Sequence, residues 1–328
     1  MDIQIIKPGM LSTIQDLGRI GYRDIGLPVA GAMDKVAAST ANLLLGNPPG
    51  SPVIEIAMGE FEFIATSSLL MACCGAGVTM TVAGVSQPLW KTLFVPAGTL
   101  VTLNYDATGT YAYLSVAGGW DAPESLGSYS TYLPAGIGQP LQRLQLLHSA
   151  KKYSAVTKSI LQRLSMDSVS GFSWGVYPST LAEYQSRVIR LIKGNEYDWF
   201  DEASLQVLTN ECFVVDADSA RMAVLLNGPV MSKREEKELL STAVDMGTIQ
   251  VNHAGRLMML MADCQTTGGY PRIAQVGAAD LPVCAQLKPG DEIRFTFITP
   301  GEAEALLLEQ TKKLDLFRQQ VESMTLLS

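Results

Sequence analysis

Short apolar runs bounded by glycine and proline recur along most of this chain. They cover residues 3–6, 61–65, 69–73, 78–82, 93–95, 99–103 and 111–116, and later residues 188–192, 212–215, 222–226, 248–251, 257–261 and 293–298. Runs of this length that are rich in β-branched residues predict β-strands, and closely spaced strands are typical of a sandwich or a barrel. We therefore expect a mainly β protein with a few helices.

Helical signals occur at three places. Asp34 is a good N-cap before an apolar stripe at helical spacing, and Gly46 with Pro48 ends that stripe. A short helix is expected at about residues 198–208. From about Pro300 onward acidic residues precede basic ones, an order that the helix dipole favours, so we expect a C-terminal helix.

The chain divides into four parts. We expect an N-terminal β lobe at residues 1–150, a connecting segment at 151–185, a second β lobe at 186–300 and a C-terminal helix at 301–328. A faint internal similarity supports two related lobes. Each lobe contains Gly-Thr, a strand, an apolar strand and then Gly-Gly-aromatic, which ends at residues 118–120 and 268–270.

Charge and composition exclude several classes of protein. The net charge is −8 and no cluster of Lys and Arg is visible, which argues against binding to nucleic acid or to anionic membranes. The five cysteines show no CxxC spacing and there are two histidines, so we predict no metal site. The N-terminus has neither a basic leader nor an apolar core of signal length, which predicts a cytoplasmic protein.

Hydrophobic residues make up 47% of the chain and charged residues 17%. Two interpretations fit this balance. Part of the apolar surface faces a partner subunit, or the fold is rich in β-structure with full cores.

The densest cluster of polar residues follows the apolar run at 257–262. Its members are Asp263, Gln265, Thr267, Gly268, Gly269, Tyr270, Arg272 and Asp280. Adjacent glycines let a backbone come close to a ligand or to another chain, and hydroxyl, guanidinium and carboxylate groups are typical of binding sites. The alternative is a Gly-Gly hairpin whose hydroxyls cap its own turn, with Arg272 in an internal pair with Asp263 or Asp280.

Further candidates lie in the first lobe. Asp16 and Arg19 flank Gly18, an arrangement suited to hold a carboxylate or an amide, although an internal Asp–Arg pair is the structural alternative. Glu55 lies in an apolar run, and Ser130 and Thr131 offer hydroxyls that can hold a substrate oxygen. No Ser-His-Asp set, Cys-His set or phosphate-binding Walker loop is visible.

Four segments resemble one known family. Residues 263–295 are similar to the C-terminal signature of the biotin-dependent carboxyltransferase-like proteins, also called allophanate hydrolase subunit 2, and residues 8–56 are similar to their N-terminal signature. Residues 113–131 and 247–251 also fit, in the same order. The resemblance covers most of residues 5–300. Free-standing bacterial members are similar to the C subunit of 5-oxoprolinase, and the family includes an antagonist of a sporulation-kinase inhibitor.

The resemblance implies tandem cyclophilin-like β-barrel lobes and a subunit of an ATP-dependent complex that opens 5-oxo-L-proline to L-glutamate. Partners similar to the A and B subunits are implied, with ATP used by the complex and no cofactor assigned to this chain. Two alternatives stay open. The chain is a carboxyltransferase-like component acting on urea or another amide, or it is a non-catalytic regulatory partner of a protein similar to the B subunit.

A lactam presents a carboxylate, an amide N–H and a carbonyl. Our hypothesis is that Arg272 takes the carboxylate, Gln250 or Gln265 the amide, and the backbone amides of Gly268 and Gly269 the carbonyl. The full set of expected substrate-binding residues is Arg19, Ser130, Thr131, Gln250, Gln265, Thr267, Gly268, Gly269, Tyr270 and Arg272. The catalytic candidates are Asp16, Glu55, Asp263 and Asp280.

The chain also departs from the family pattern. Where members usually have Gly-Tyr-Arg-Leu-Glu, this chain has Ala223, Val224, Leu225, Leu226 and Asn227. A usual aspartate is replaced by Tyr132. The changes at residues 223–227 thin the charged set in the second lobe, and the change at Tyr132 removes one carboxylate from the first, so the identity of the substrate stays open.

Overall fold

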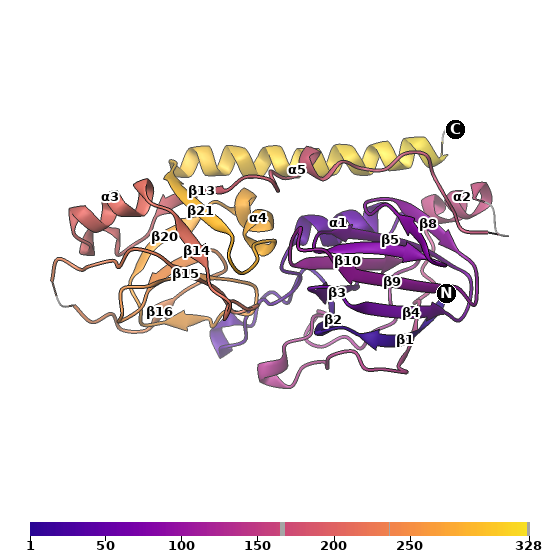
Figure 1. Ribbon diagram of the computed structural model, residues 1–328, viewed down its shortest axis with the longest axis horizontal. Helices are drawn as coiled ribbons and strands as arrows, with labels where there is room; N and C mark the ends of the chain where they lie inside the picture. Colours follow the sequence, from indigo (N-terminus) through magenta and orange to yellow (C-terminus); the bar gives the residue numbers. More distant parts are fainter. Residues whose placement is uncertain (165–167, 236, 327–328) are drawn as a thin grey trace. The chain divides into compact units, whose positions relative to one another are not determined.

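The protein is described by a computed structural model that covers residues 1–164, 168–235 and 237–326. Its residue contacts form two compact units (Figure 1). Unit 1 comprises Met1–Gly18, Asp34–Leu181 and the described part of Lys312–Ser328, and unit 2 comprises Arg19–Met33 and Ala182–Thr311. The chain therefore passes between the units more than once.

Unit 1 contains two six-stranded sheets. The first has the order β11 (Leu146–His148), β1 (Asp2–Pro8), β4 (Phe61–Ala65), β9 (Leu100–Tyr105), β6 (Val78–Val82) and β7 (Val85–Gln87). The second has the order β12 (Ser170–Gly171), β8 (Thr92–Val95), β5 (Leu69–Gly75), β10 (Tyr111–Val116), β3 (Val53–Ala57) and β2 (Leu11–Gln15). Most of the neighbouring strands are antiparallel, as in the pairing of β1 with β4.

The two sheets of unit 1 differ in burial, and the sequence shows why. In β4 alternate residues are buried, as expected for a strand with one face on the core. In β5 and β10 every residue is buried, because the helix α1 (Lys35–Leu43) packs against these two strands.

The expected helix after Asp34 is confirmed. The carboxylate of Asp34 accepts a hydrogen bond from the N–H of Ala37 at 2.9 Å, which caps the first turn of α1. The segment expected only as a connection contains α2 (Ala155–Arg163), capped by Ser154, whose Oγ accepts from the N–H of Thr157 at 3.0 Å. The sequence of α2 is short and mostly polar, so it does not show the apolar stripe that predicts a helix.

Unit 2 is built on a closed seven-stranded barrel. Its order is β13 (Val188–Lys193), β20 (Arg272–Val276), β17 (Thr248–Val251), β18 (Leu257–Leu260), β15 (Ala223–Asn227), β14 (Phe213–Val215) and β21 (Glu292–Phe297), and a parallel pairing of β13 with β21 closes it. A two-stranded sheet of β16 (Thr242–Ala243) and β19 (Thr267–Gly268) lies outside this order. The expectation of a mainly β protein with barrel lobes and a few helices is confirmed.

Helices complete unit 2. The helix α3 (Glu202–Asn210) begins later than expected, because Asp201 caps it and a 3-10 turn, Tyr197–Trp199, precedes it. A short helix, α4 (Leu281–Ala285), follows β20. The expected C-terminal helix is confirmed as α5 (Pro300–Leu326), which belongs to unit 2 up to Thr311 and to unit 1 from Lys312. No helix in the described ranges has the length and hydropathy needed to cross a membrane.

The segment Arg19–Met33 belongs to unit 2 by its contacts. The N–H of Arg19 donates to the carbonyl oxygen of Val29 at 2.8 Å, and Arg221 Nη2 donates to the carbonyl oxygen of Gly31 at 2.8 Å.

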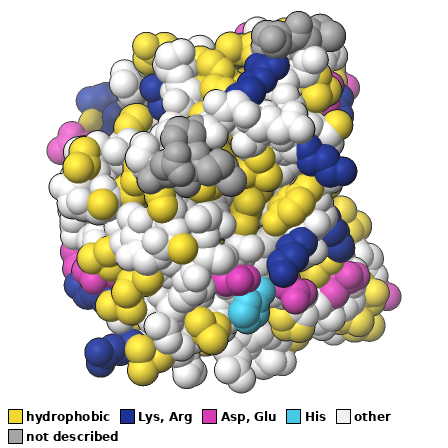
Figure 2. Space-filling view, turned by 90° about the vertical axis from the view of Figure 1, so that its right-hand side faces the viewer, with side chains coloured by type: hydrophobic (Ala, Val, Ile, Leu, Met, Phe, Trp, Pro, Cys, Tyr) yellow, Lys and Arg dark blue, Asp and Glu magenta, His cyan; other side chains and the backbone are white. Residues whose placement is uncertain are grey.

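Among the described residues, the surface shows no large patch of one charge on the face drawn in Figure 2. Lys and Arg side chains are dispersed there among Asp and Glu side chains.

Candidate functional site

Arg272 stands at the start of β20 and lines a hollow of about 370 Å³ in unit 2. The other residues of its wall that carry charged or polar side chains are Arg23, Lys193, Asn195, Asp245, Thr248 and Gln275. The wall combines distant parts of the chain, because Arg23 comes from the 19–33 segment and Lys193 ends β13.

Glu196 holds the guanidinium of Arg272 in one orientation. Nε donates to Oε2 and Nη2 donates to Oε1, both at 2.8 Å, and Nη1 donates to the carbonyl oxygen of Ala243 at 3.0 Å. Burial by itself would raise the pKa of Glu196, but the hydrogen bonds and positive charge of Arg272 outweigh it and hold that pKa below its ordinary value. The hydrogen bonds that Arg272 donates to Glu196 raise the pKa of Arg272, so both groups are charged at neutral pH.

The hollow has one positive charge in excess. Arg23 Nη1 lies 2.6 Å from Asp245 Oδ1, and Glu196 offsets Arg272. Lys193 forms no ion pair with a carboxylate in the part of the chain that the structure describes. Such a surplus favours a ligand with a single negative charge, and a carboxylate is the simplest example.

Two neighbouring residues of the cluster face a different hollow. Gly269 and Tyr270 line a space of about 740 Å³, also in unit 2. The ring of Tyr270 packs edge-on against His253, with ring centres 5.1 Å apart. Arg272 and the pair Gly269 and Tyr270, which were expected to form one site, thus line different hollows.

Gly268 is needed for a close approach between segments. A Cβ at this position would lie 2.7 Å from Nε2 of Gln250. Gln250 is fully buried, and its Nε2 donates to the carbonyl oxygen of Tyr270 at 3.0 Å. The amide of Gln250 therefore supports the 268–270 segment from inside, while Thr267 is exposed on β19 and Gln265 is half-buried just before it.

The structure pairs Asp263 and Asp280 with arginines other than Arg272. Arg221 holds Asp263 through Nε–Oδ2 and Nη2–Oδ1 bonds of 2.8 Å each. Arg190 holds Asp280, with 2.7 Å between the Arg190 backbone N and Oδ2 and 3.1 Å between Nε and each oxygen. The alternative in which Arg272 forms an internal pair with Asp263 or Asp280 is therefore wrong, because Arg272 pairs with Glu196.

Asp16 is enclosed by donors in unit 1. Its carboxylate accepts from Ser128 Oγ at 2.7 Å, from Ser130 Oγ, and from the N–H groups of Gly18 and Tyr129 at 2.8 Å each. This arrangement fixes the 128–130 loop against the end of β2. Asp16 and Ser130 are thus brought together as expected, in a network that is satisfied internally.

The remaining candidates are not among the residues that line the hollow at Arg272. Glu55 is buried in β3 and accepts from the hydroxyl of Tyr113 at 2.9 Å. Thr131 is buried, and its carbonyl oxygen accepts from Gln15 Nε2 at 3.2 Å. Both belong to unit 1, whereas the side chain of Arg19, which is 1% exposed, belongs to unit 2.

The sequence did not predict Glu196, which pairs with Arg272, or the wall residues Arg23 and Lys193. Glu196 lies 76 positions before its partner, and Arg23 and Lys193 come from two other segments. The one available signal was Gly194 beside Lys193 and Glu196, since a glycine between charged residues can mark a close approach. Within the described residues, no group of three or more His, Cys, Asp and Glu side chains could hold a metal ion.

Comparison with known proteins identifies the family. The chain is 35% identical to the 5-oxoprolinase C subunit of Escherichia coli (strain K12) over 303 residues, which cover 92% of this chain and 93% of that protein. It is 32% identical to the 5-oxoprolinase C subunit of Haemophilus influenzae over 320 residues, 98% of this chain and 99% of that protein.

The fold agrees with a solved structure. The crystal structure of the K. lactis urea amidolyase superposes with a TM-score of 0.82 and 24% identity, covering 96% of this chain and 20% of that chain. This chain thus corresponds in length to about one fifth of that enzyme, which is much longer. Residues 25–297 match the family model described as carboxyltransferase domain, subdomain A and B. The chain belongs to the family of carboxyltransferase domains composed of subdomains A and B.

Proposed function

We propose that this chain is a subunit of an ATP-dependent, cytoplasmic 5-oxoprolinase complex that opens 5-oxo-L-proline to L-glutamate. The support is its identity of 35% and 32% to two proteins named as the C subunit of 5-oxoprolinase, each covered almost completely. The proposed partners are proteins similar to the A and B subunits of that complex. We assign the use of ATP to the complex and no cofactor to this chain.

The hollow at Arg272 carries the proposal for substrate binding. A guanidinium has five N–H groups, and three of those of Arg272 are bonded to Glu196 and Ala243. One N–H on each of Nη1 and Nη2 remains for a ligand, in a wall with one surplus positive charge. 5-Oxoproline carries one carboxylate, which matches that charge.

We assign the other contacts of the lactam to residues of the same wall. Lys193 adds a cation for the carboxylate, and the exposed amide of Asn195 suits the lactam N–H or carbonyl. Gln250 is enclosed by the 268–270 segment, so we give it a supporting role instead of a contact with the substrate.

A non-catalytic role within the complex is the second candidate. It is favoured by the hydrogen bonding of the candidate acids, because Asp16, Asp263 and Asp280 all accept several donors from the chain itself. A general acid or base must exchange a proton with a substrate within hydrogen-bond reach, and these three carboxylates are already occupied. Carboxyl transfer to urea or another amide is a third candidate, which the name of the family model favours.

The test is reconstitution. The chain is co-expressed with proteins similar to the A and B subunits, and glutamate release from 5-oxo-L-proline is followed with and without ATP. We expect ATP-dependent release by the complex and none by the purified chain alone. Turnover by the isolated chain would contradict the subunit role, and ATP-dependent consumption of urea without release of glutamate would favour the third candidate.

A further inference from the structure

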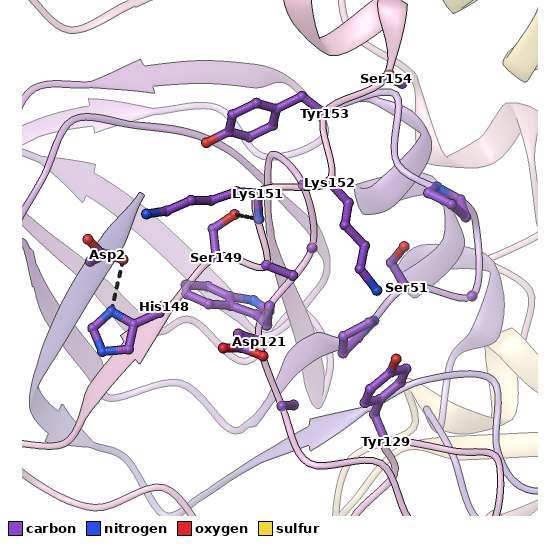
Figure 3. Close-up of a pocket in the computed structure, with 18 residues that line it drawn as sticks. Asp2, Ser51, Asp121, Tyr129, His148, Ser149, Lys151, Lys152, Tyr153 and Ser154 are labelled. Carbon is purple, nitrogen blue, oxygen red and sulfur yellow. Dashed lines mark hydrogen bonds and ion pairs between the residues drawn. The ribbon is translucent and has the colours of Figure 1, made fainter.

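Unit 1 contains a larger hollow, of about 1250 Å³, that the proposed function does not use (Figure 3). Its wall includes Gly118 and Gly119, the glycine pair of the first lobe, together with the 148–154 segment. Binding pockets for small molecules commonly measure several hundred Å³ and combine apolar walls with a few well-placed polar groups. This hollow is somewhat larger than such a pocket and has its mixed wall.

Two adjacent lysines supply its cationic groups. Figure 3 shows the side chains of Lys151 and Lys152 extending to opposite sides of the hollow. Neither ammonium forms an ion pair with a carboxylate in the described part of the chain. Two divergent cations on one wall can hold two separate anionic groups of one ligand.

The backbone fixes the place of both lysines. The N–H of Ala150 donates to the carbonyl oxygen of Gly119 at 2.9 Å, and the N–H of Lys151 donates to Ser149 Oγ at 3.1 Å. A Cβ at Gly118 would lie 2.8 Å from the backbone N of Lys152, so the two segments need glycine to pack this closely. Lys151 has a φ of 57°, a left-handed conformation that side chains other than glycine seldom adopt. Strained residues of this kind concentrate at binding sites.

The wall, together with the N-terminal ammonium beside it, has a net positive charge even when its acidic groups are counted. Asp2 is engaged by His148, whose Nδ1 lies 2.9 Å from Oδ1, and by the N-terminal ammonium at 3.8 Å. Asp121 is the other carboxylate of the wall and is exposed. Since the N-terminal ammonium offsets the charge of Asp2, the two lysines outweigh Asp121.

We propose that this hollow binds a small organic anion with two negatively charged groups, carboxylate or phosphate, one held by Lys151 and the other by Lys152. Gly118, Gly119 and Ser149 position the lysines, and Asp121 weakens binding by repulsion. The site is independent of the hollow at Arg272, because each hollow is formed within a different unit. Binding here would therefore survive a failure of the proposed activity.

Isothermal titration calorimetry on the full chain at low ionic strength tests this site. The probes are glutarate for the dicarboxylate source, pyrophosphate for the phosphate source and acetate for a single charge. We expect glutarate or pyrophosphate to bind more tightly than acetate, and the preferred probe identifies the source. If neither probe binds, or if acetate binds equally well, the proposal is wrong.

Substitutions distinguish binding at this site from nonspecific attraction between the anion and the positive charges of the protein. Lys152→Gln, and the pair Lys151→Gln with Lys152→Gln, should weaken binding by about tenfold or more, since each removes a charge-assisted contact. Lys151→Arg with Lys152→Arg should retain binding, and Asp121→Asn should tighten it. Lys158→Gln, on the exposed face of α2 and outside the wall, should bind like the parent. Equal affinity in the Gln variants, or weaker binding by Asp121→Asn, would overturn the proposal.

Discussion

Glu196 and Arg272 form a two-pronged ion pair although 76 positions separate them in the chain. Their side chains are 8% and 16% exposed, so the pair is largely shielded from water. Because the same guanidinium lines the hollow of unit 2, one contact links the stability of the barrel to the shape of the candidate site. A variant at either residue must therefore be judged on stability and on activity.

Glu196→Ala should destabilise unit 2 markedly. Removing one partner of a shielded ion pair leaves the other charge without compensation, which costs about 3 kcal/mol. Urea unfolding followed by the fluorescence of Trp199, the tryptophan of unit 2, measures the change. Glu235→Gln, in the exposed pair of Lys237 with Glu235 in the same unit, is the control and should leave the midpoint unchanged, since exposed pairs contribute little. A midpoint for Glu196→Ala equal to that of the parent would show that Arg272 does not depend on this pair.

The contribution of Glu196 to the stability of the folded state should disappear in acid. Its pKa in the folded protein lies below the ordinary value of 4.5, so the folded state binds the proton less readily than the unfolded state does. The stabilisation is therefore fully present above the unfolded pKa and is lost as the pH falls through the folded pKa. We expect the difference in melting temperature between the parent and Glu196→Gln to be constant from about pH 5.5 to 8 and to shrink below about pH 4.5. A difference that grows in acid would contradict the assigned direction.

Gly194→Ala should be far more harmful than Gly301→Ala. A Cβ at Gly194 would lie 2.2 Å from the carbonyl oxygen of Arg272 and 2.8 Å from the N of Ala274, both backbone atoms that cannot move without shifting β20. Overpacking of this kind costs about 1–3 kcal/mol. A Cβ at Gly301 would meet nothing within 4 Å and would lie in α5, so that variant should keep or slightly raise the stability. Thermal unfolding of both variants, followed by circular dichroism, compares them directly.

Alkylation should modify Cys212 first in the folded protein. Cys73, Cys74, Cys264 and Cys284 are buried, and burial raises the pKa of Cys73 and of Cys264 to about 12 each, which leaves almost no reactive thiolate at neutral pH. Cys212 is only partly buried. Mass spectrometry after a short iodoacetamide pulse should find one label in the parent and none in Cys212→Ser, and five in the denatured parent. Rapid labelling of the Cys212→Ser variant while folded would show that one of the buried cysteines is accessible.

Local patterns were sufficient for most of the strands and for two helices. The bounds of β4, β6, β10 and β17 equal those expected, because each is a compact apolar run with clear polar ends. The strand β20 was not expected, since Arg272 and Gln275 interrupt its apolar pattern; one pairs with Glu196, and the other hydrogen-bonds to Thr248. These residues meet their partners only when the barrel closes, and a local pattern in the sequence does not predict that closure.

The candidate site was harder to predict than the fold for the same reason. The chemistry of Arg272 was recognisable from its neighbours, whereas Glu196, Arg23 and Lys193 become relevant only through contacts between distant segments. The association of residues 19–33 with unit 2 is also a tertiary event, because that segment follows β2 of unit 1 directly. Asp16 gave a strong sequence signal for a different purpose, which is to tie the 128–130 loop to the end of β2.

Arg272→Lys should separate substrate binding from support of the barrel. Lysine keeps the positive charge but loses the planar fork, so it cannot hold Glu196 at two points and also offer two N–H groups to a carboxylate. In the reconstituted complex we expect KM for 5-oxo-L-proline to rise about tenfold or more, with a smaller change in kcat, because a contact to the carboxylate is made in the ground state and in the transition state alike. Arg190→Lys is the matched control. It disrupts a comparable pair with Asp280, outside the hollow, and should lower the melting temperature without raising KM. If both variants lose stability and neither changes KM, Arg272 is a structural residue and the carboxylate must bind elsewhere.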